Sequence, residues 1–403
     1  MSAPRPDLRV QLAARRAERE QQQLLRRVRE IERVDGVDAW IDGRRLTTFC
    51  SNDYLGLARH PALIRALQNA AAETGVGSTA SALVCGQHRA HAELEQALAE
   101  WTGRERALLF SSGYLANLGV LQALLTRGDL CVQDKLNHAS LLDAAALAGA
   151  ELKRYPHADA EAAARQLDSR LQAAALLASD GVFSMDGDVA PLAALASQAR
   201  TRSAMLLIDD AHGIGVLGPR GAGCVAEAGL DQDEVPLLLG TLGKALGCTG
   251  AFVAGRAALI DDLAQFARTH IYTTAMPPAL AAAATCAVRL AQTESWRRKK
   301  LAARIARFRH GAAQLGLALL PSSSAIQPLL LGTAQAALDA ANTLEQHGLL
   351  VTAIRPPTVP QGQARLRITL SAAHTDEQVD RLLDALELQR FGIRSNIGRP
   401  AGI

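Results

Sequence analysis

The sequence predicts an α/β protein with a large domain built on a mainly parallel sheet, followed by a small α/β domain. Short apolar runs alternate with 10–15-residue helical patterns from about residue 46 to 290, which is typical of strand–helix–strand units. A shorter series of helix and strand patterns follows. A chain of 403 residues is long enough for two or three domains. We therefore expect an N-terminal arm (1–45), a large domain (46–290) and a small C-terminal domain (291–403).

Composition and charge exclude several classes of protein. The chain is 49% apolar and 21% charged, as in ordinary soluble globular proteins. A net charge of +3 provides no basic stripe for nucleic acid and no polybasic membrane patch. No apolar run reaches the roughly 18 residues of a membrane span, and the polar N-terminus lacks a secretory core. Six scattered cysteines without a C-x-x-C pair predict reduced thiols in a cytoplasmic protein, with no metal site.

The N-terminal arm is charged, with alanine and leucine at helical spacing, so we expect a helix over residues 7–33. Arg26 and Arg27 fall late in it, and either could meet an anionic substrate if the arm packs over the site. Solvated arginines are the simpler interpretation. Residues 40–49 predict a hairpin around Asp42-Gly43.

A serine- and glycine-containing segment follows the apolar strand predicted at 107–110 and opens a helix. Helix N-termini bind phosphate through free N–H groups and the helix dipole. Gly113 and Tyr114 are therefore candidates for a phosphate cup, with Tyr114 beside a ring. Capping of the helix by Ser112 is the competing explanation, and both can hold together.

Two further strands are each followed by polar residues. His138 comes after the strand at 130–133 and could stack on a flat cofactor, although a lone histidine is more often structural. Ser184 comes after the strand at 173–178 and could hydrogen-bond an oxygen of the same cofactor.

The apolar strand predicted at 205–209 ends in Asp209, and His212 lies three residues on. Ligands of an open α/β sheet bind outside the carboxyl ends of its strands, so Asp209 is a candidate ligand contact. A helix cap is the more common role for a strand-end aspartate.

Lys244 follows the apolar run 235–239 and a glycine-containing turn with Thr241. Partial burial there would lower the lysine pKa, which suits a nucleophile or a Schiff base. A surface lysine is the simpler interpretation. A phosphate loop is excluded, because Leu238 and Ala245 stand where that pattern needs Gly and Ser or Thr.

Asp209 and Lys244 together predict a specific cofactor. Both would project from strand ends into one crevice. A lysine that forms a Schiff base, facing an aspartate that keeps a pyridine nitrogen protonated, is what pyridoxal phosphate needs to act as an electron sink.

The C-terminal part adds candidate phosphate and carboxylate contacts. Thr273 and Thr274 could contact a phosphate, either in the same chain or across a subunit boundary. Arg355 with Thr358, and Arg367 on the last predicted strand, are candidate carboxylate binders, with surface arginines as the alternative. The elements expected here are helix 333–347, helix 375–390 and strands at 326–331, 349–354 and 364–370.

Five segments carry a resemblance to a known family: 51–56, 137–140, 181–188, 209–213 and 241–244. With them, the chain resembles the α-oxoamine synthases over residues 8–390. These are pyridoxal-phosphate enzymes with the aspartate aminotransferase fold, so the resemblance implies that fold, that cofactor and a homodimer. Asp180 departs from the family, which usually has a glutamate there.

The resemblance also implies roles for individual residues. Lys244 would bind the cofactor covalently, Asp209 would pair with its ring nitrogen, and His138 would stack on its ring. Other contacts to the ring and phosphate are expected from Gly113, Tyr114, Ser184, His212 and Thr241. Substrate contacts are expected from Arg26, His138, Thr358 and Arg367.

Two segments, 324–329 and 352–360, are similar to the branch of the family that acts in biotin synthesis. That branch implies a decarboxylating condensation of L-alanine with a pimeloyl thioester, carried by CoA or by an acyl carrier protein. Another α-oxoamine synthase, such as a glycine C-acetyltransferase or a 5-aminolevulinate synthase, is an alternative. A second alternative is a vitamin-binding protein whose site has no catalytic activity. The presence of all four candidate catalytic residues argues against it: Lys244, Asp209, His138 and His212.

Overall fold

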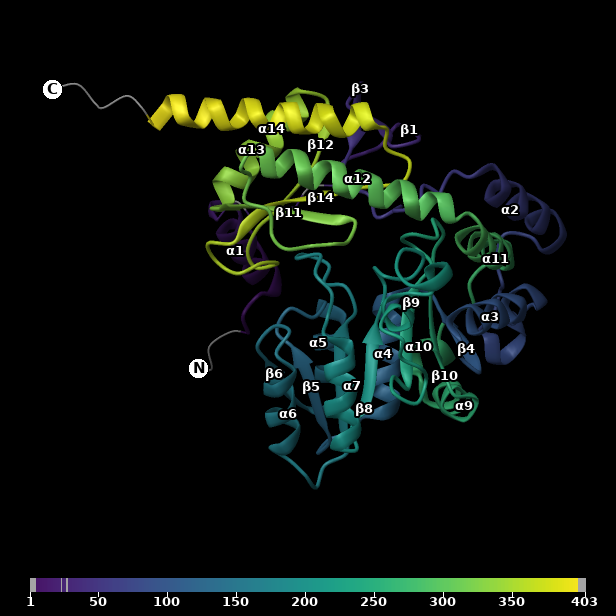
Figure 1. The fold of residues 1–403 in the computed structure, drawn as a ribbon. Coiled ribbons are helices and arrows are strands. Elements are labelled where there is room, and N and C mark those ends of the chain that lie inside the picture. Colours follow the sequence, from purple (N-terminus) through teal and green to yellow (C-terminus); the bar gives the residue numbers. More distant parts are fainter. Residues whose placement is uncertain (1–4, 23, 27, 398–403) are drawn as a thin grey trace.

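The computed structural model describes residues 5–22, 24–26 and 28–397. A large sheet with helices on both sides forms the lower part of the molecule in Figure 1, and smaller sheets with two long helices lie above it. Within the described residues, no helix is both long and apolar enough to cross a bilayer.

The large sheet has seven strands, and only β10 runs antiparallel to its neighbours. The mainly parallel sheet predicted from the sequence is therefore confirmed. The strands are, in spatial order, β4 (Arg106–Phe110), β10 (Ala251–Gly255), β9 (Leu237–Thr241), β8 (Met205–Asp209), β7 (Ala175–Asp180), β5 (Leu130–Asp134) and β6 (Glu151–Tyr155).

Helices cover both faces of this sheet, because successive strand residues point to opposite faces and both sets are apolar. One face packs against α4 (Gly113–Leu124), α5 (Ala139–Ala148) and α9 (Ala257–Phe266). The other packs against α3 (Arg89–Thr102), α6 (Ala160–Asp168), α7 (Leu192–Thr201) and α11 (Pro278–Thr293). The remaining helical segments of this part are α2 (Pro61–Thr74), η1 (Ala82–Gly86), η2 (Pro219–Gly221), α8 (Cys224–Glu227) and α10 (Arg268–Ile271).

The C-terminal part contains a sheet and helices of its own, and its buried residues belong to the same core cluster as one face of the large sheet. Its antiparallel sheet has the order β11 (Ile326–Gly332), β14 (Ala364–Thr369), β13 (Thr352–Ile354). Its helices are α12 (Ser295–Gln314), α13 (Ala334–Gln346) and α14 (Asp376–Ile397). The single strand predicted at 349–354 is split in two, because β12 (Leu349–Leu350) joins a different sheet.

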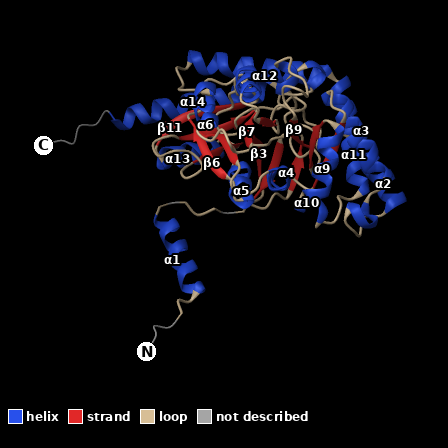
Figure 2. Cartoon of the chain, turned by 90° about the horizontal axis from the view of Figure 1, so that it is seen from below, coloured by secondary structure: helices blue, strands red, loops and turns tan. Residues whose placement is uncertain are grey.

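The predicted arm helix is wrong in length. The helix α1 (Leu8–Gln21) ends well before residue 33, where β1 (Arg33–Asp35) begins. None of its residues is buried, and Figure 2 shows α1 projecting away from the sheets. A helix gains most of its stability from packing an apolar face. Because α1 packs no such face against the described part of this chain, packing gives no reason for the helix to continue to residue 33.

The predicted hairpin is confirmed as β2 (Asp38–Ile41) and β3 (Arg44–Thr48). Its turn residues Asp42 and Gly43 both have positive φ, 52° and 69°, as a two-residue hairpin turn requires. The predicted domain boundary at residue 45 falls inside β3. Because β3 pairs with β12 of the C-terminal part, we propose that the hairpin belongs to the small domain, with the large domain between the hairpin and α12.

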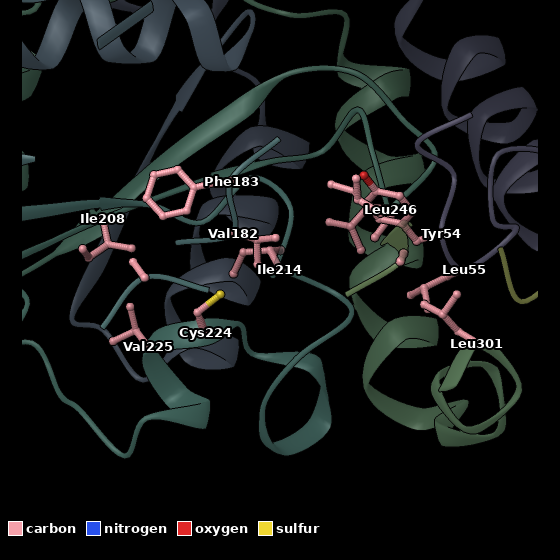
Figure 3. Close-up of a cluster of buried hydrophobic side chains, with 14 of the residues drawn as sticks. Tyr54, Leu55, Val182, Phe183, Ile208, Ile214, Cys224, Val225, Leu246 and Leu301 are labelled. Atoms are coloured by element: carbon pink, nitrogen blue, oxygen red, sulfur yellow. The ribbon is translucent and has the colours of Figure 1, made fainter. Parts of the chain in front are cut away.

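Buried apolar side chains lie directly behind the loops that leave β7 and β8. Figure 3 shows Phe183 near Ile208, and Val182 and Ile214 together near Cys224. All five are almost fully buried. Close packing of this kind restricts where the polar residues of the same loops can lie.

Candidate active site

A cavity opens where β5, β7, β8 and β9 end, at the carboxyl edge of the large sheet, as expected for an open α/β sheet. The loop after each strand contributes side chains to it, and so does the N-terminus of α4. The lining consists of Gly113, Tyr114, His138, Ser140, Asp180, Val182, Ser184, Asp209, Ala211, His212, Thr241 and Lys244. The structure therefore brings together the predicted lysine, aspartate, both histidines and most of the predicted cofactor contacts.

Lys244 lies at one end of a chain of hydrogen bonds. Its Nζ is 2.8 Å from Nε2 of His212, and Nδ1 of His212 is 2.7 Å from the Tyr54 hydroxyl. The Tyr54 hydroxyl in turn donates to Oδ1 of Asn52 at 3.1 Å. This order satisfies every group when the Lys244 ammonium donates to Nε2 and Nδ1–H of His212 donates to Tyr54. Lys244 is thus held by a base and not by a carboxylate.

Burial is the main cause of the unusual protonation at this end of the cavity. It lowers the pKa of Lys244 to about 8, despite the opposing charges of Asp209 and Asp180. Burial also lowers the pKa of His212 well below its usual value, and the charges of Lys244 and Arg367 add to this. A neutral amine is consequently accessible near neutral pH, as a Schiff-base lysine requires.

Asp209 also lines the cavity and is 7% exposed. Its Oδ2 accepts from Nδ2 of Asn117 at 2.7 Å, and its Oδ1 accepts from the backbone N of Ala211 at 3.1 Å. Both donors are neutral, and no described basic side chain forms an ion pair with this carboxylate. A buried carboxylate is costly without a cationic partner, so the site suits a ligand with a protonated nitrogen.

His138 is tied to the same network. Its Nδ1 is 2.8 Å from Oγ of Ser140, which accepts from Nδ2 of Asn117 at 2.9 Å. Burial lowers the pKa of His138, partly offset by the charge of Asp209. The carboxylate of Asp180 accepts from the backbone N of His138 at 3.2 Å. The shorter side chain of Asp180 is therefore long enough to accept this hydrogen bond, without the extra methylene of the glutamate usual in the family.

The N-terminus of α4 faces the cavity with Gly113 and Tyr114. Ser112 caps the helix, since its Oγ accepts from the backbone N of Leu115 at 3.3 Å. The capping explanation is therefore correct, and it leaves the other N–H groups of the first turn for an anion. The Tyr114 hydroxyl donates to Asp143 outside the cavity lining.

Arg367 lies just behind the cavity wall and is almost fully buried. Its Nε donates to the carbonyl of Ser184 at 2.6 Å, and both Nη atoms lie 3.3 Å from Oδ1 of Asn52. The predicted carboxylate binder is thus fixed from both sides. Its remaining N–H groups are free of any bond to an acidic side chain among the described residues.

Other predicted residues lie elsewhere in this chain. Thr273 and Thr274 line a different pocket, beside Ser111 and Met276. Arg26 is exposed in the coil after α1, and Arg27 lies outside the described residues. Arg355 is half-buried and Thr358 exposed, and neither belongs to the described lining of the cavity. Among the described residues of a single chain, therefore, Arg26, Thr273, Thr274, Arg355 and Thr358 do not line the cavity that holds Lys244.

Sequence reasoning missed four residues of the network: Asn52, Tyr54, Asn117 and Ser140. Asn117 is completely buried, and its Oδ1 has no partner in the described structure. Asn52 and Tyr54 lie within the motif 51–56. No local pattern gives Asn117, Tyr54 and Asn52 their roles, because their bonds to Asp209, His212 and Arg367 span 92, 158 and 315 positions of the chain.

The family model for class I and II aminotransferases matches residues 44–386. An 8-amino-7-oxononanoate synthase of Xanthomonas campestris pv. campestris (strain B100) is 57% identical, over 95% of this chain and 96% of that protein. The protein of that name from Xylella fastidiosa (strain M12) is 55% identical, over 96% of both. The chain belongs to the 8-amino-7-oxononanoate synthase family.

Solved structures agree with this placement. A serine palmitoyltransferase of Sphingomonas wittichii superposes with a TM-score of 0.92 at 32% identity, covering 96% of this chain and all of that one. The 8-amino-7-oxononanoate synthase of Francisella tularensis superposes with a TM-score of 0.76 at 29% identity, covering 87% and 99%. The predicted aminotransferase-like fold is therefore confirmed.

The lowered pKa of Lys244 predicts that this lysine destabilises the cofactor-free protein. The folded state binds the proton less readily than the unfolded chain, so the cost is full below about pH 8 and fades as pH rises towards the unfolded pKa. We expect Lys244→Met to raise the free energy of unfolding at pH 7 by on the order of 2 kcal/mol. Urea unfolding at pH 7 and pH 10 measures this gain, which should shrink at the higher pH.

The exposed Lys299 on α12 provides the matched control. Lys299→Met should leave the unfolding free energy nearly unchanged at both pH values. Equal effects of the two substitutions would contradict a burial cost at Lys244.

Proposed function

We propose that this protein condenses L-alanine with a pimeloyl thioester, with loss of CO₂, to give 8-amino-7-oxononanoate and a free thiol. The observation that carries the proposal is the presence in one cavity of a partly buried lysine of lowered pKa and a buried carboxylate that forms no ion pair with a described basic side chain. Its relatives of 55–57% identity are 8-amino-7-oxononanoate synthases. The cofactor is pyridoxal phosphate, which two solved serine palmitoyltransferases of 30% identity contain.

The residues of the cavity fit this cofactor. Lys244 would bind it covalently, and Asp209 would pair with its protonated ring nitrogen, replacing the cation that the carboxylate lacks. The first turn of α4 would hold the phosphate. Other contacts are proposed for Tyr114, His138, Ser184, His212 and Thr241. When bound, the cofactor supplies an electron sink for the electron pair left at the alanine α-carbon.

The side chains around Lys244 suggest how protons move. Once alanine has displaced it, the neutral Lys244 amine is placed to take the α-proton and later to return one. Nε2 of His212, 2.8 Å away, stabilises the ammonium that forms, and the bond to Tyr54 fixes the His212 tautomer. Arg367, held by Ser184 and Asn52, is oriented to bind a substrate carboxylate.

The donor of the acyl group remains a proposal in two forms, pimeloyl-CoA and a pimeloyl carrier protein. Arg26, Arg355 and Thr358 are kept as candidate substrate contacts for either. A cytoplasmic location is also proposed, supported by six cysteines that are all free thiols.

A homodimer is proposed because predicted contacts are missing from the single-chain cavity. Thr273 and Thr274 line a separate pocket. Exposed apolar side chains gather in the same stretches of chain, with Val84 78% and Tyr272 72% exposed. Such a surface is typical of an interface. We propose that a second copy covers it, so that these threonines approach the phosphate of the partner's cofactor.

Replacing Asp209 tests the role of the carboxylate. We expect Asp209→Ala to retain the visible absorption of the lysine-bound cofactor but to lose at least about 100-fold in kcat, because an aspartate partner shifts a nearby pKa by about 1–3 units. Absorption spectra and steady-state rates measure both effects. The exposed Asp384 of α14 is the control, as Asp384→Asn should behave like the wild type. Wild-type turnover in Asp209→Ala would refute the proposed role.

Substrate preference tests the branch of the family. We expect kcat/KM for alanine with pimeloyl-CoA to exceed that for glycine with acetyl-CoA or succinyl-CoA by at least about tenfold, since each buried methylene contributes about 0.8 kcal/mol. Product analysis by mass spectrometry identifies the ketone formed. A preference for glycine with a short acyl donor would place the enzyme in another branch.

The dimer has its own test. Tyr272→Glu should convert dimer to monomer in sedimentation analysis and weaken cofactor binding with it. Thr273→Val with Thr274→Val should keep the dimer but weaken cofactor binding about tenfold, as expected for lost hydrogen bonds to a charged phosphate. Cofactor binding that is unchanged in both variants would exclude a contribution from the second copy.

A further inference from the structure

The His157 side chain lies outside the cavity and hydrogen-bonds two aspartates, each of which holds a loop that lines the cavity. His157 follows β6, and its Nδ1 lies 3.1 Å from Oδ1 of Asp134 while its Nε2 lies 2.8 Å from Oδ2 of Asp188. Its ring packs edge-on against Phe183, with 4.4 Å between ring centroids. Every polar atom of this imidazole is therefore used, and none of them faces the cavity.

Asp134 organises the turn that leads to His138. It is the last residue of β5 and is fully buried. Its Oδ1 also accepts from the backbone N of Leu136 at 2.7 Å, and its backbone carbonyl accepts from the N of Asn137 at 3.2 Å. Its Oδ2 accepts from the N of Ala158, next to His157. The Asp134 carboxylate thus joins the His138 turn to the His157 loop.

Asp188 closes the loop that carries Ser184. Its carbonyl accepts from the backbone N of Phe183 at 3.0 Å, and the carbonyl of Phe183 accepts from Gly187 at 2.8 Å. The small domain holds the same loop from the other side. Arg367 donates to the carbonyl of Ser184, and Ser322 Oγ donates to the carbonyl of Gly187 at 2.8 Å. Ser184 is therefore clamped between the two domains.

The bridge is a cation between two carboxylates. Burial alone would lower the pKa of His157, but its hydrogen bonds to Asp134 and Asp188 outweigh this and raise the pKa to about 10. The imidazole is consequently charged at neutral pH, and charge-assisted hydrogen bonds are about twice as strong as neutral ones. Oδ1 of Asp188 is buried without a partner in the described structure, so losing His157 would remove the ion pair that the other oxygen of this carboxylate makes.

We propose that His157 is a positioning residue that fixes His138 and Ser184 relative to each other across the cavity. It acts through Asp134 on the first and through Asp188 on the second. Its catalytic meaning depends on the proposed function, while the physical coupling of the two loops does not.

Hydrogen exchange of the cofactor-free protein tests the coupling. In His157→Leu, we expect amides of residues 134–140 and 181–188 to exchange at least about tenfold faster, because both loops lose an anchor. Residues 205–212 of β8 and its turn should exchange as in the wild type. His157→Gln, which can donate to only one carboxylate with good geometry, should loosen one loop more than the other. His310→Gln, exposed on α12, is the control and should change neither.

Activity of the holoenzyme tests the consequence. We expect His157→Leu to lower kcat about tenfold or more with a smaller change in the KM for alanine, and to shift the visible circular dichroism of the bound cofactor. Asp188→Asn keeps an acceptor for Nε2, so it should retain more of the kcat than Asp188→Ala.

Three outcomes would overturn the proposal: faster exchange in only one loop in His157→Leu, equally faster exchange throughout the chain, or an unchanged kcat. A wild-type protein that is inactive with alanine and pimeloyl thioester, but whose two loops loosen together in His157→Leu, would refute the proposed function and leave the positioning role standing.

Discussion

The placement of an amine and a carboxylate at the ends of two adjacent parallel strands is the constraint on which the site depends. Asp209 ends β8, and Lys244 follows β9, which pairs with β8. Both strands are buried, so the charges they carry enter a region of low dielectric, where desolvation and pairing decide protonation. The sheet therefore places Lys244 and Asp209 near each other and influences the protonation of both. Two chains of hydrogen bonds hold their side chains, one from Lys244 to Asn52 and one from Asp209 to His138.

The small domain supports the cavity from outside, whereas the residues that line it come from the large sheet and its loops. Arg367 reaches Ser184 and Asn52, and Arg365 reaches Asp186 at 2.8 Å. These contacts cross from the C-terminal sheet to the loop after β7. A movement of the small domain would therefore move Ser184, so the substrate binding proposed for Arg367 would be coupled to the geometry of the cavity. Arg367, a predicted substrate contact, is buried and not exposed because it also holds the loop that carries Ser184.

Local patterns predicted most of the fold. Apolar runs predicted five of the seven strands of the large sheet, because a strand covered on both faces is apolar throughout. The strands β6, which has the sequence Glu-Leu-Lys-Arg-Tyr, and β10 were not predicted. The hairpin at Asp42-Gly43 followed from turn chemistry. The predicted length of the arm helix was wrong, because its alternation of alanine and charge suits a helix but its apolar residues Leu8, Val10 and Leu12 stay exposed in this chain. The strand at 349–354 failed for a related reason, since its two halves pair with different sheets and pairing partners are not visible locally.

For the site, the sequence by itself determined which chemistry was available: a lysine after one buried strand, an aspartate at the end of another, and a resemblance that assigned both to one cofactor. Only the tertiary structure decided how these groups are held. Asn117, Tyr54 and His157 act through partners far away in the chain, and hydrogen bonds of that kind depend on how strands and helices are stacked. Spacing along a sequence carries no information about such contacts until the packing of the core has brought their ends together.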